Sequence, residues 1–114
     1  MATDQELITQ TVQDYFGGWY DAHVAPMGRA LHPGLVKRSP GEDRGAILAK
    51  QPMLQACAEG NGTRVAGRLV KIGIADVCGA IASAVVRSAP YQEYLHLMRT
   101  GDGWKIADAL WLPR

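Results

Sequence analysis

The stretch that decides the fold is Tyr94–Trp111, which reads YLHLMRTGDGWKIADALW. The turn-forming residues 101–103 lie between two runs of alternating apolar residues, and this arrangement predicts a β-hairpin. Side chains alternate between the two faces of a strand, so we expect Ile106, Asp108 and Leu110 to share one face of the second arm. A carboxylate between two aliphatic neighbours is the feature on which the functional interpretation depends.

The register of this hairpin decides which residue lies beside Asp108. We expect a three-residue loop at 101–103, because the glycine at its end suits a left-handed backbone conformation. This register pairs His96 with Asp108. A loop of two or four residues would change the parity of the first strand and put Leu95 and Leu97 on that face instead.

Length and composition indicate one globular domain. The chain has 114 residues, of which 47% are hydrophobic and 20% are charged, and this balance suits a single folded unit spanning 1–114. The net charge is +1 and the basic residues are scattered, so we expect no nucleic-acid partner. The N-terminus lacks the features of a signal peptide, and no stretch approaches the roughly 20 apolar residues of a membrane span. We therefore expect a cytoplasmic protein with no membrane partner.

Metal, cofactor and thiol chemistry are not indicated by the sequence. The two cysteines, Cys57 and Cys78, do not form a CxxC pair, and we interpret both as free, buried, structural thiols. The three histidines have neither the HExxH spacing nor any close cluster, so no metal site is expected. The glycine-containing turns lie outside any phosphate-binding or dinucleotide-binding pattern, so no cofactor is expected.

The first part of the chain has helical periodicity. Thr3 and Glu6 have the spacing of a capping box, which predicts the start of a helix. An apolar stripe with intervals of three or four residues follows, at Ile8, Val12, Tyr15, Phe16 and Trp19. Gly17–Gly18 interrupts the helix beside large aromatic residues, which indicates either close packing or a bend.

Two further helices are expected before the strands begin. One spans Val24–Leu31 and precedes an extended segment at 36–39 and a loop at 40–45. The other lies within 46–60, where Pro52 must either kink the helix or begin a fresh segment.

From Thr63 onward the period changes from helical to alternating. Four strands separated by turn residues are expected, at 64–77, 80–88, 91–99 and 104–111. Helices followed by a run of neighbouring strands predict an α+β fold with an antiparallel sheet.

This order of elements is similar to that of the nuclear transport factor 2-like superfamily. The segments that carry the resemblance are DYFGGWYDA, RALHPGLVKR, IASAVV and YLHLMRTGDGWKIADALW, which together represent nearly the whole chain. The HP turn and the GDGWKI segment are the most specific, and the chain looks closest to the branch labelled "putative lumazine-binding" or SnoaL-like. The resemblance implies a curved antiparallel sheet with N-terminal helices that form a cone-shaped pocket, a cystatin-like α+β barrel.

The resemblance also implies an apolar pocket and often a homodimer. Members include ketosteroid isomerases, polyketide cyclases, epoxide hydrolases and dehydratases, and others are inert binding or assembly modules, so the fold does not choose the function. Two segments depart from the branch: Cys78 and Ala80 stand where Tyr and Asp are common, and Asp108 stands where Asn is common. The exchange is compatible with a diverged enzyme and equally with a scaffold altered to hold a base.

Asp108 is the candidate catalytic residue. If its face of the strand is the concave one, burial raises the pKa of the carboxyl group and strengthens it as a base. Such a carboxylate can abstract a proton from carbon, and His96 is the candidate orienting or acid partner. The structural alternatives are that Asp108 hydrogen-bonds to the backbone or faces water, and that His96 is a cross-strand structural residue.

Further residues are candidates for substrate binding. Aromatic side chains at a pocket mouth can stack on a planar ligand, a tyrosine hydroxyl can donate to an oxyanion, and methionine can contour a cavity. The same residue types can equally be plain core. The substrate-binding candidates are Tyr15, Trp19, Met27, Met53, Tyr94, Ile106 and Leu110.

Two functions are consistent with these residues. The first is cofactor-free proton abstraction from a hydrophobic, aromatic small molecule by Asp108, in an isomerase, a cyclase or an eliminase. The second is a non-catalytic ligand-binding or assembly homodimer in which Asp108 makes a structural hydrogen bond. Hydrolysis by an activated water would need more polar pocket groups than the sequence assigns.

Overall fold

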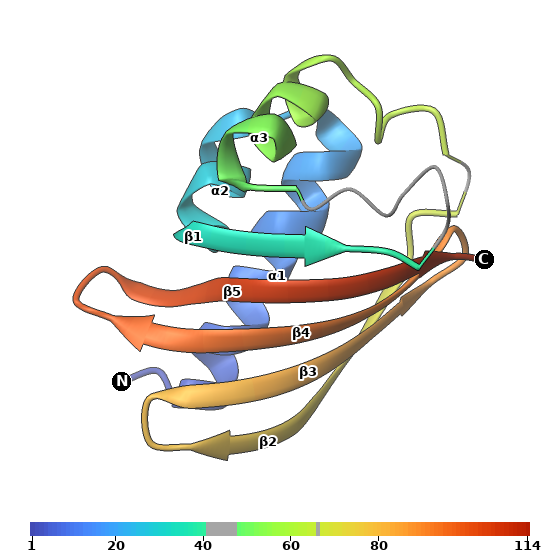
Figure 1. The fold of residues 1–114 in the computed structure, drawn as a ribbon. Coiled ribbons are helices and arrows are strands. Elements are labelled where there is room, and N and C mark those ends of the chain that lie inside the picture. The colour runs from blue at the N-terminus through green and yellow to red at the C-terminus, as the bar shows by residue number, and fades with distance from the viewer. Residues whose placement is uncertain (41–47, 66) are drawn as a thin grey trace.

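The computed structural model of the protein describes residues 1–40, 48–65 and 67–114. Within these residues the chain forms three helices and five strands (Figure 1). In chain order they are α1 (Asp4–Asp21), α2 (Val24–Ala30), β1 (Leu31–Arg38), α3 (Lys50–Ala58), β2 (Val70–Cys78), β3 (Ile81–Ser88), β4 (Tyr91–Thr100) and β5 (Gly103–Pro113).

The five strands form one curved sheet in the order β1-β5-β4-β3-β2. The predicted α+β class is confirmed, and β2 to β5 are consecutive antiparallel neighbours as expected. The edge strand β1 differs, because it pairs parallel to β5. From β1 the chain passes through α3 and enters the sheet again at its far edge, in β2. The sheet is open between β1 and β2 (Figure 1), so it does not close into a barrel.

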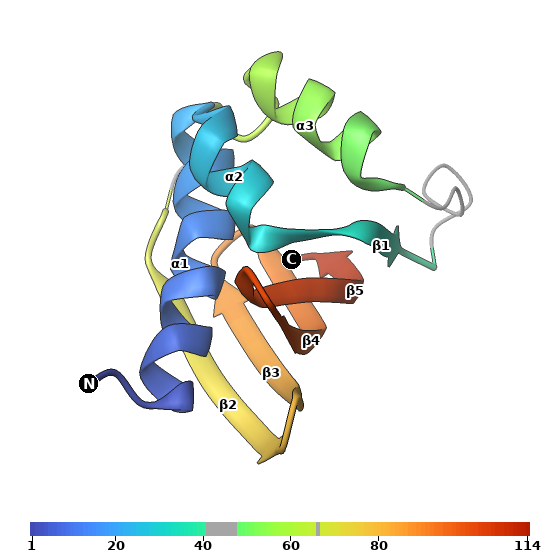
Figure 2. The ribbon, with the colours of Figure 1, turned by 90° about the vertical axis from the view of Figure 1, so that its left-hand side faces the viewer.

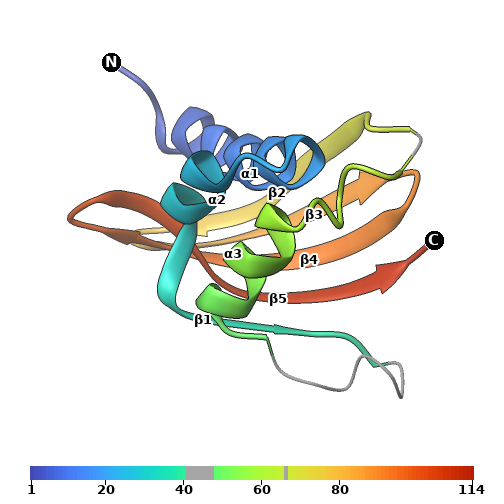
Figure 3. The ribbon, with the colours of Figure 1, turned by 90° about the horizontal axis from the view of Figure 1, so that it is seen from above.

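The three helices lie on the concave side of the sheet, here called the inner face (Figure 2, Figure 3). α1 runs across this face, and α2 and α3 lie beside each other near the edge strand β1. The opposite surface, here called the outer face, is not covered by any other element of the described chain. One side of β1, β3, β4 and β5 therefore has buried residues, whereas the inward side of the edge strand β2 is only partly buried.

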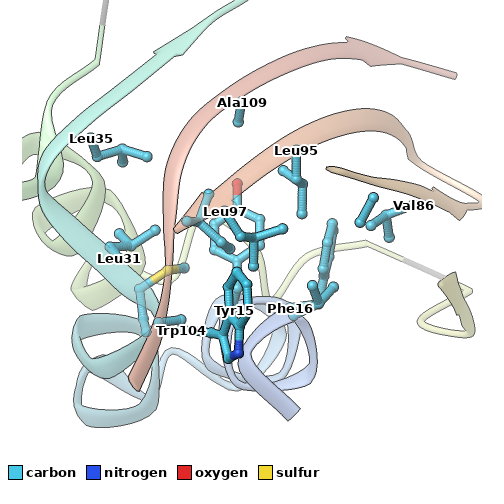
Figure 4. Close-up of a cluster of buried hydrophobic side chains, with 14 of the residues drawn as sticks. Tyr15, Phe16, Leu31, Leu35, Val86, Leu95, Leu97, Trp104 and Ala109 are labelled. Atoms are coloured by element: carbon cyan, nitrogen blue, oxygen red, sulfur yellow. The ribbon is translucent and has the colours of Figure 1, made fainter. Parts of the chain in front are cut away.

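The hydrophobic core fills the space between the helices and the inner face. Figure 4 shows labelled side chains from α1, β1, β3, β4 and β5 that meet in this interior. Burial of each large apolar side chain contributes about 1.5–3 kcal/mol to folding. The largest fully buried side chains are Ile8, Val12, Met27, Leu31, Met53, Cys57, Val86, Leu95, Leu97 and Ile106.

The start of α1 follows the predicted capping box. The backbone N–H of Glu6 donates to Thr3 Oγ1 at 3.1 Å, and the backbone N–H of Thr3 donates to Glu6 Oε1 at 3.4 Å. These bonds satisfy amides that would otherwise lack partners in the first turn. The apolar stripe faces the sheet as expected, with Ile8, Val12, Tyr15 and Phe16 buried and Trp19 half-buried.

The two adjacent glycines of α1 have different surroundings. A Cβ on Gly18 would lie 2.8 Å from the carbonyl oxygen of His23 and 3.0 Å from Cβ of Met27, whereas a Cβ on Gly17 would meet nothing within 4 Å. Of the two predicted explanations, close packing applies to Gly18, because its missing side chain allows α2 to approach α1.

The shorter helices also lie near their predicted positions. α2 spans Val24–Ala30, one residue shorter than expected, and α3 starts at Lys50. Pro52 therefore lies in the first turn of a new helix and does not kink a longer one. Most of the loop expected at 40–45 lies outside the described residues. No helix of the described chain is both long and apolar enough to cross a bilayer.

The β4–β5 hairpin has a different turn from the predicted one. Thr100 pairs with Gly103, and Leu97 pairs with Ile106. The loop therefore consists of two residues, Gly101 and Asp102, and the three-residue prediction is wrong. This register places Leu97 and Ile106 together on the inner face, where both are buried.

A β-bulge at Ala107 then changes the register along the same hairpin. His96 pairs with Asp108 although Leu97 pairs with Ile106, so Ala107 is an extra residue in β5. The predicted pairing of His96 with Asp108 is thus confirmed. It results from a two-residue loop together with a bulge, and not from the predicted three-residue loop. The bulge also reverses the alternation: Ile106 and Ala109 are buried, and Asp108 between them is exposed.

Candidate functional site

Asp108 lies on the outer face and not in the concave interior. Its carboxylate Oδ1 is 2.8 Å from Nδ1 of His96, and the two side chains are 53% and 68% exposed. The prediction that Asp108 shares a face with Ile106 and projects into an apolar pocket is therefore wrong. The Ala107 bulge is the cause. Asp108 is exposed to solvent, so the desolvation on which its predicted role depends is absent at this position.

Four of the predicted substrate-binding residues also lie away from an interior pocket. Tyr94 and Leu110 pair with each other and are about half exposed, 51% and 48%, which puts them on the outer face with Asp108. Met27 and Ile106 are fully buried in the core, and neither lines the inner-face cavity. These four assignments are therefore wrong. Tyr94 and Leu110 face outward because the bulge reverses the alternation of β5, and Met27 and Ile106 are packed in the core.

A cavity of about 220 Å³ lies between α1, α3 and the inner face of the sheet. Three predicted residues, Tyr15, Trp19 and Met53, line it as expected. Its wall is largely apolar and aromatic, with two charged side chains among the lining residues. The complete lining is Tyr15, Phe16, Trp19, Lys37, Leu48, Met53, Ala56, Asn61, Tyr91, Glu93 and Trp111.

The two charged residues, Lys37 and Glu93, form a buried network with Tyr15. Lys37 Nζ donates to the hydroxyl of Tyr15 at 2.5 Å, and this hydroxyl donates to Oε1 of Glu93 at 3.0 Å. Lys37 Nζ is also 3.6 Å from the same oxygen. Tyr15 and Glu93 are each 2% exposed and Lys37 is 8% exposed, so water screens this network weakly.

Burial changes the acid–base properties of the network. It lowers the pKa of the Lys37 ammonium, because desolvation disfavours the charged form, and the carboxylate of Glu93 opposes part of this shift. Burial also raises the pKa of Tyr15 well above its usual value of 10.0, and the negative charge of Glu93 adds to that increase. Tyr15 therefore remains a neutral hydroxyl that bridges the amine and the carboxylate.

Aromatic rings surround the ammonium of Lys37. Nζ lies 5.1 Å from the ring centroid of Tyr15 and 5.3 Å from that of Trp111, distances at which a cation is attracted to a ring face. The indole N–H of Trp19 donates to the hydroxyl of Tyr91 at 3.2 Å, and the rings of Tyr91 and Trp111 meet edge to face at 5.9 Å. These contacts hold the aromatic wall in place beside the ion pair.

The sequence interpretation missed Lys37 and Glu93, although a signal for both was present. Glu93, Leu95 and Leu97 occupy every second position along β4, so their side chains share one face of the strand. Leu35 and Lys37 share a face of β1 in the same way. A charged residue that shares a strand face with apolar leucines is expected to point inward. The same rule predicts an inward-facing Asp108, but the bulge at Ala107 turns that side chain outward.

Larger hollows lie on the outer face, and we consider them less suitable as sites. They measure about 420 and 640 Å³ and share His96, Met98, Ala107 and Asp108. Both are more open than the inner cavity, and the hydrogen-bonded side chains of His96 and Asp108 in their walls are each more than half exposed. In the described part of the chain, no three His, Cys, Asp or Glu side chains gather closely enough to hold a metal ion.

The two cysteines differ in their surroundings. Cys57 is buried as expected, its Sγ lies 3.2 Å from the carbonyl oxygen of Gly18, and burial raises the pKa of its thiol. Cys78 is exposed at the end of β2, so its predicted burial is wrong.

Comparisons with known proteins agree with this fold. A family model described as "Putative lumazine-binding" matches residues 3–112, and no curated protein matches the chain. An NTF2-like protein of unknown function from Silicibacter pomeroyi is similar in structure, with a TM-score of 0.79, 16% identity and full coverage of both chains. A ketosteroid isomerase-like protein from Erwinia carotovora atroseptica has a TM-score of 0.75 and 15% identity, over 99% of this chain and 98% of that one.

A third similar structure is a domain of unknown function with a cystatin-like fold from Nostoc punctiforme. Its TM-score is 0.71 and its identity 13%, over 100% of this chain and 80% of that one. Identities this low show a shared fold and leave the activity open. The nuclear transport factor 2-like fold expected from the sequence is confirmed.

The Tyr15 hydroxyl gives a testable pH dependence. At neutral pH, Tyr15→Phe removes a bridging hydroxyl from a buried network, and we expect a loss of about 1–3 kcal/mol in the free energy of unfolding. The folded-state pKa of Tyr15 is raised, so its contribution is complete below 10.0 and declines as the pH rises above that value. The difference between wild type and Tyr15→Phe should therefore shrink in urea denaturation curves measured above pH 10.0.

Tyr94→Phe is the matched control, because Tyr94 is half exposed on the outer face. Its unfolding free energy should differ from wild type by less than about 0.5 kcal/mol. A Tyr15→Phe deficit that stays constant to about one pH unit above 10.0 would contradict the raised pKa.

Proposed function

This chain belongs to the family described as "Putative lumazine-binding", and from that premise we propose that its inner-face cavity binds a flat small molecule of one or two rings. The ligand has a polar edge that faces Lys37 and Glu93, and its rings lie against Trp19 and Trp111. The observation that supports this proposal best is the buried Lys37–Glu93 pair in the wall of an aromatic cavity.

An ion pair at this position is costly for folding alone. Desolvation of two charges takes several kcal/mol per ion, and well-packed apolar residues often stabilise a core equally well. Ligand sites, in contrast, combine an apolar lining with a few convergent polar groups that orient the bound molecule. We infer that Lys37 and Glu93 serve ligand recognition.

The size of the cavity limits the ligand. An apolar protein cavity of about 150 Å³ holds benzene, so a cavity of about 220 Å³ suits a single substituted ring or two fused rings. Within the described residues, the side-chain contacts of Glu93 with Tyr15 and Lys37 both involve Oε1, and we expect Oε2 to accept from the ligand. Lys37 supplies an N–H donor, so the matching edge has an N–H beside a carbonyl group.

Lumazine itself is a suitable first ligand, since it is a flat fused two-ring molecule with N–H groups next to carbonyls. We expect it to bind wild type in isothermal titration calorimetry. Glu93→Gln should weaken binding about 10- to 100-fold, because a hydrogen bond to a charged group contributes about 1.5–3 kcal/mol. Asp108→Asn makes the same chemical change on the outer face and should leave the affinity unchanged.

A second variant protects this test against a folding defect. Ala56→Phe places a large side chain in the cavity without removing a charged group, and it should abolish binding while thermal unfolding remains cooperative. Equal affinities of wild type, Glu93→Gln and Ala56→Phe would place the ligand elsewhere and contradict the proposal.

Proton transfer is the second candidate function. We propose Glu93, in place of Asp108, as the carboxylate that removes a proton from a bound carbon acid, with the Lys37 ammonium beside the developing oxyanion. The observation in its favour is that Glu93 is enclosed and next to a cation, whereas Asp108 is hydrated. Proton transfer requires a carbon acid held against this carboxylate, whereas ligand binding requires only the cavity and its polar groups, so we place this function after ligand binding.

Deuterium exchange of 2-indanone, a flat two-ring ketone with acidic C–H groups, tests proton transfer. In D₂O the wild-type protein should accelerate the loss of the α-proton signal in the NMR spectrum, and Glu93→Gln should reduce the acceleration at least tenfold. Asp108→Asn should exchange at the wild-type rate. Binding of 2-indanone without acceleration would leave a binding protein and rule out this second function.

We also propose that the outer face is covered by a second copy of the chain. Several large apolar side chains on this face are about half exposed or more. They are Ile81, Tyr94, Leu110 and Leu112. Val85, Tyr94 and Leu110 are neighbours in register across three strands. A two-fold axis through such a row would bury the same patch on both copies, with one sheet packed on the other.

Size-exclusion chromatography with light scattering tests this assembly. Wild type should have about twice the 12.3 kDa chain mass, and the double variant Tyr94→Lys, Leu110→Lys should be monomeric because it places charges in the interface. Leu7→Lys changes an exposed leucine on α1 and should remain a dimer. A monomeric wild type across the micromolar range would contradict the proposal.

A further inference from the structure

The lysine of the inner cavity is buried beside a hydroxyl group and a carboxylate. We propose that Lys37 forms an imine with an aldehyde or ketone in the cavity, with Tyr15 and Glu93 handling the protons. The proposal rests on ligand access to the cavity, as in the proposed function, and adds a covalent step. The observation that supports the imine proposal is the hydrogen-bonded arrangement of three groups, Lys37 Nζ, the Tyr15 hydroxyl and Glu93 Oε1.

These atoms form a continuous hydrogen-bonded path from the ammonium to the carboxylate. Lys37 Nζ donates to the Tyr15 hydroxyl at 2.5 Å, and the Tyr15 hydroxyl donates to Glu93 Oε1 at 3.0 Å. The ammonium can pass one proton to the hydroxyl while the hydroxyl passes its own to the carboxylate. This exchange produces a neutral amine, a neutral hydroxyl and a carboxylic acid, with no charge left in the cavity.

The surroundings of Lys37 favour this exchange. Among the described residues, the groups that face Nζ are the Tyr15 hydroxyl from α1, Glu93 from β4 and the ring of Trp111 from β5. Glu93 is the charged member of this set, and it is the acceptor of the exchanged proton. The neutral pair avoids the cost of two buried charges, and the lowered pKa of Lys37 has the same origin.

The chemical step is balanced within these groups. The neutral amine of Lys37 attacks the carbonyl carbon, and a C–N bond forms as the carbonyl π bond breaks. One proton then moves from the attacking nitrogen to the carbonyl oxygen, which gives a neutral carbinolamine and leaves Glu93 protonated. Glu93 then supplies a proton to the hydroxyl, the C–O bond breaks, and water leaves as the imine nitrogen becomes positively charged. The sum is ammonium plus carbonyl compound to protonated imine plus water, with Glu93 again a carboxylate beside the cation.

Two other lysines, Lys71 and Lys105, lack this environment within the described part of the chain. Lys71 lies on an exposed position of β2, and Lys105 Nζ donates to the backbone carbonyl of Arg29 at 2.6 Å on an exposed part of the structure. Within the described residues, neither lysine forms an ion pair with a carboxylate that could accept its proton. Selective reaction of Lys37 at neutral pH is the expected consequence.

Benzaldehyde with sodium cyanoborohydride tests the proposal, since the reducing agent converts an imine into a stable benzyl amine. Intact-mass spectrometry and peptide mapping at pH 7 should show Lys37 modified at least tenfold faster than Lys71. Lys37→Arg keeps the positive charge beside Glu93 and should abolish the fast reaction. Lys71→Arg should leave it unchanged. Equal rates at Lys37 and Lys71, or a fast reaction that survives Lys37→Arg, would overturn the proposal.

Tyr15→Phe tests the proton path separately from the amine. Without the hydroxyl, modification of Lys37 should slow at pH 7 and recover as the pH rises and solvent base replaces the path. The conservative Tyr94→Phe should have the wild-type pH profile. A Tyr15→Phe profile identical to wild type would overturn the role of Tyr15 as the positioning residue of the path.

A benzyl alcohol titration distinguishes this proposal from the proposed function. Benzyl alcohol has the ring of benzaldehyde but no carbonyl, and its binding reports access to the cavity alone. Competition by benzyl alcohol against fast Lys37 modification supports both ideas. Binding of benzyl alcohol without fast modification by benzaldehyde overturns imine formation alone, and absence of both results overturns ligand access as well.

Discussion

The structure depends on holding two opposite charges, Lys37 and Glu93, in an interior from which water is largely excluded. Each charge is buried by elements that are distant in sequence: Lys37 comes from β1, Glu93 from β4, and the bridging Tyr15 from α1. An unpaired buried charge costs several kcal/mol. The parallel pairing of β1 with β5 brings Lys37 to Glu93, and the docking of α1 supplies the hydroxyl that bridges them.

The Ala107 bulge determines which side chains of β5 share this interior. After the bulge, Ala109 and Trp111 point inward, where Ala109 lies opposite Lys37 and Trp111 lies opposite Glu93. An uninterrupted strand would have turned Asp108 and Leu110 inward at these positions. A second carboxylate close to Glu93 would oppose its ionisation. The bulge thus supplies an aromatic wall and leaves the ion pair with one acid and one base.

The sequence predicted the fold well, because its signals are local. The capping box at Thr3, the stripe along α1 and the alternation of the four strands each follow from neighbouring residues. The site was predicted less well. Inward charges at Lys37 and Glu93 could have been found by alternation with leucines, but their pairing joins strands that are far apart in sequence. The bulge leaves no signal, since alanine at 107 is compatible with either register.

In the chemistry proposed above, the position of one proton distinguishes a site that only binds a ligand from one that reacts with it. With the proton on Lys37, the cavity offers a cation and an anion, which is a recognition site for a ligand with matching donor and acceptor groups. With the proton on Glu93, the cavity offers a nucleophilic amine and an acid. Tyr15 connects the two states without moving any backbone atom, because its hydroxyl both accepts and donates. A ligand that stabilises one state more than the other therefore selects the chemistry of the site.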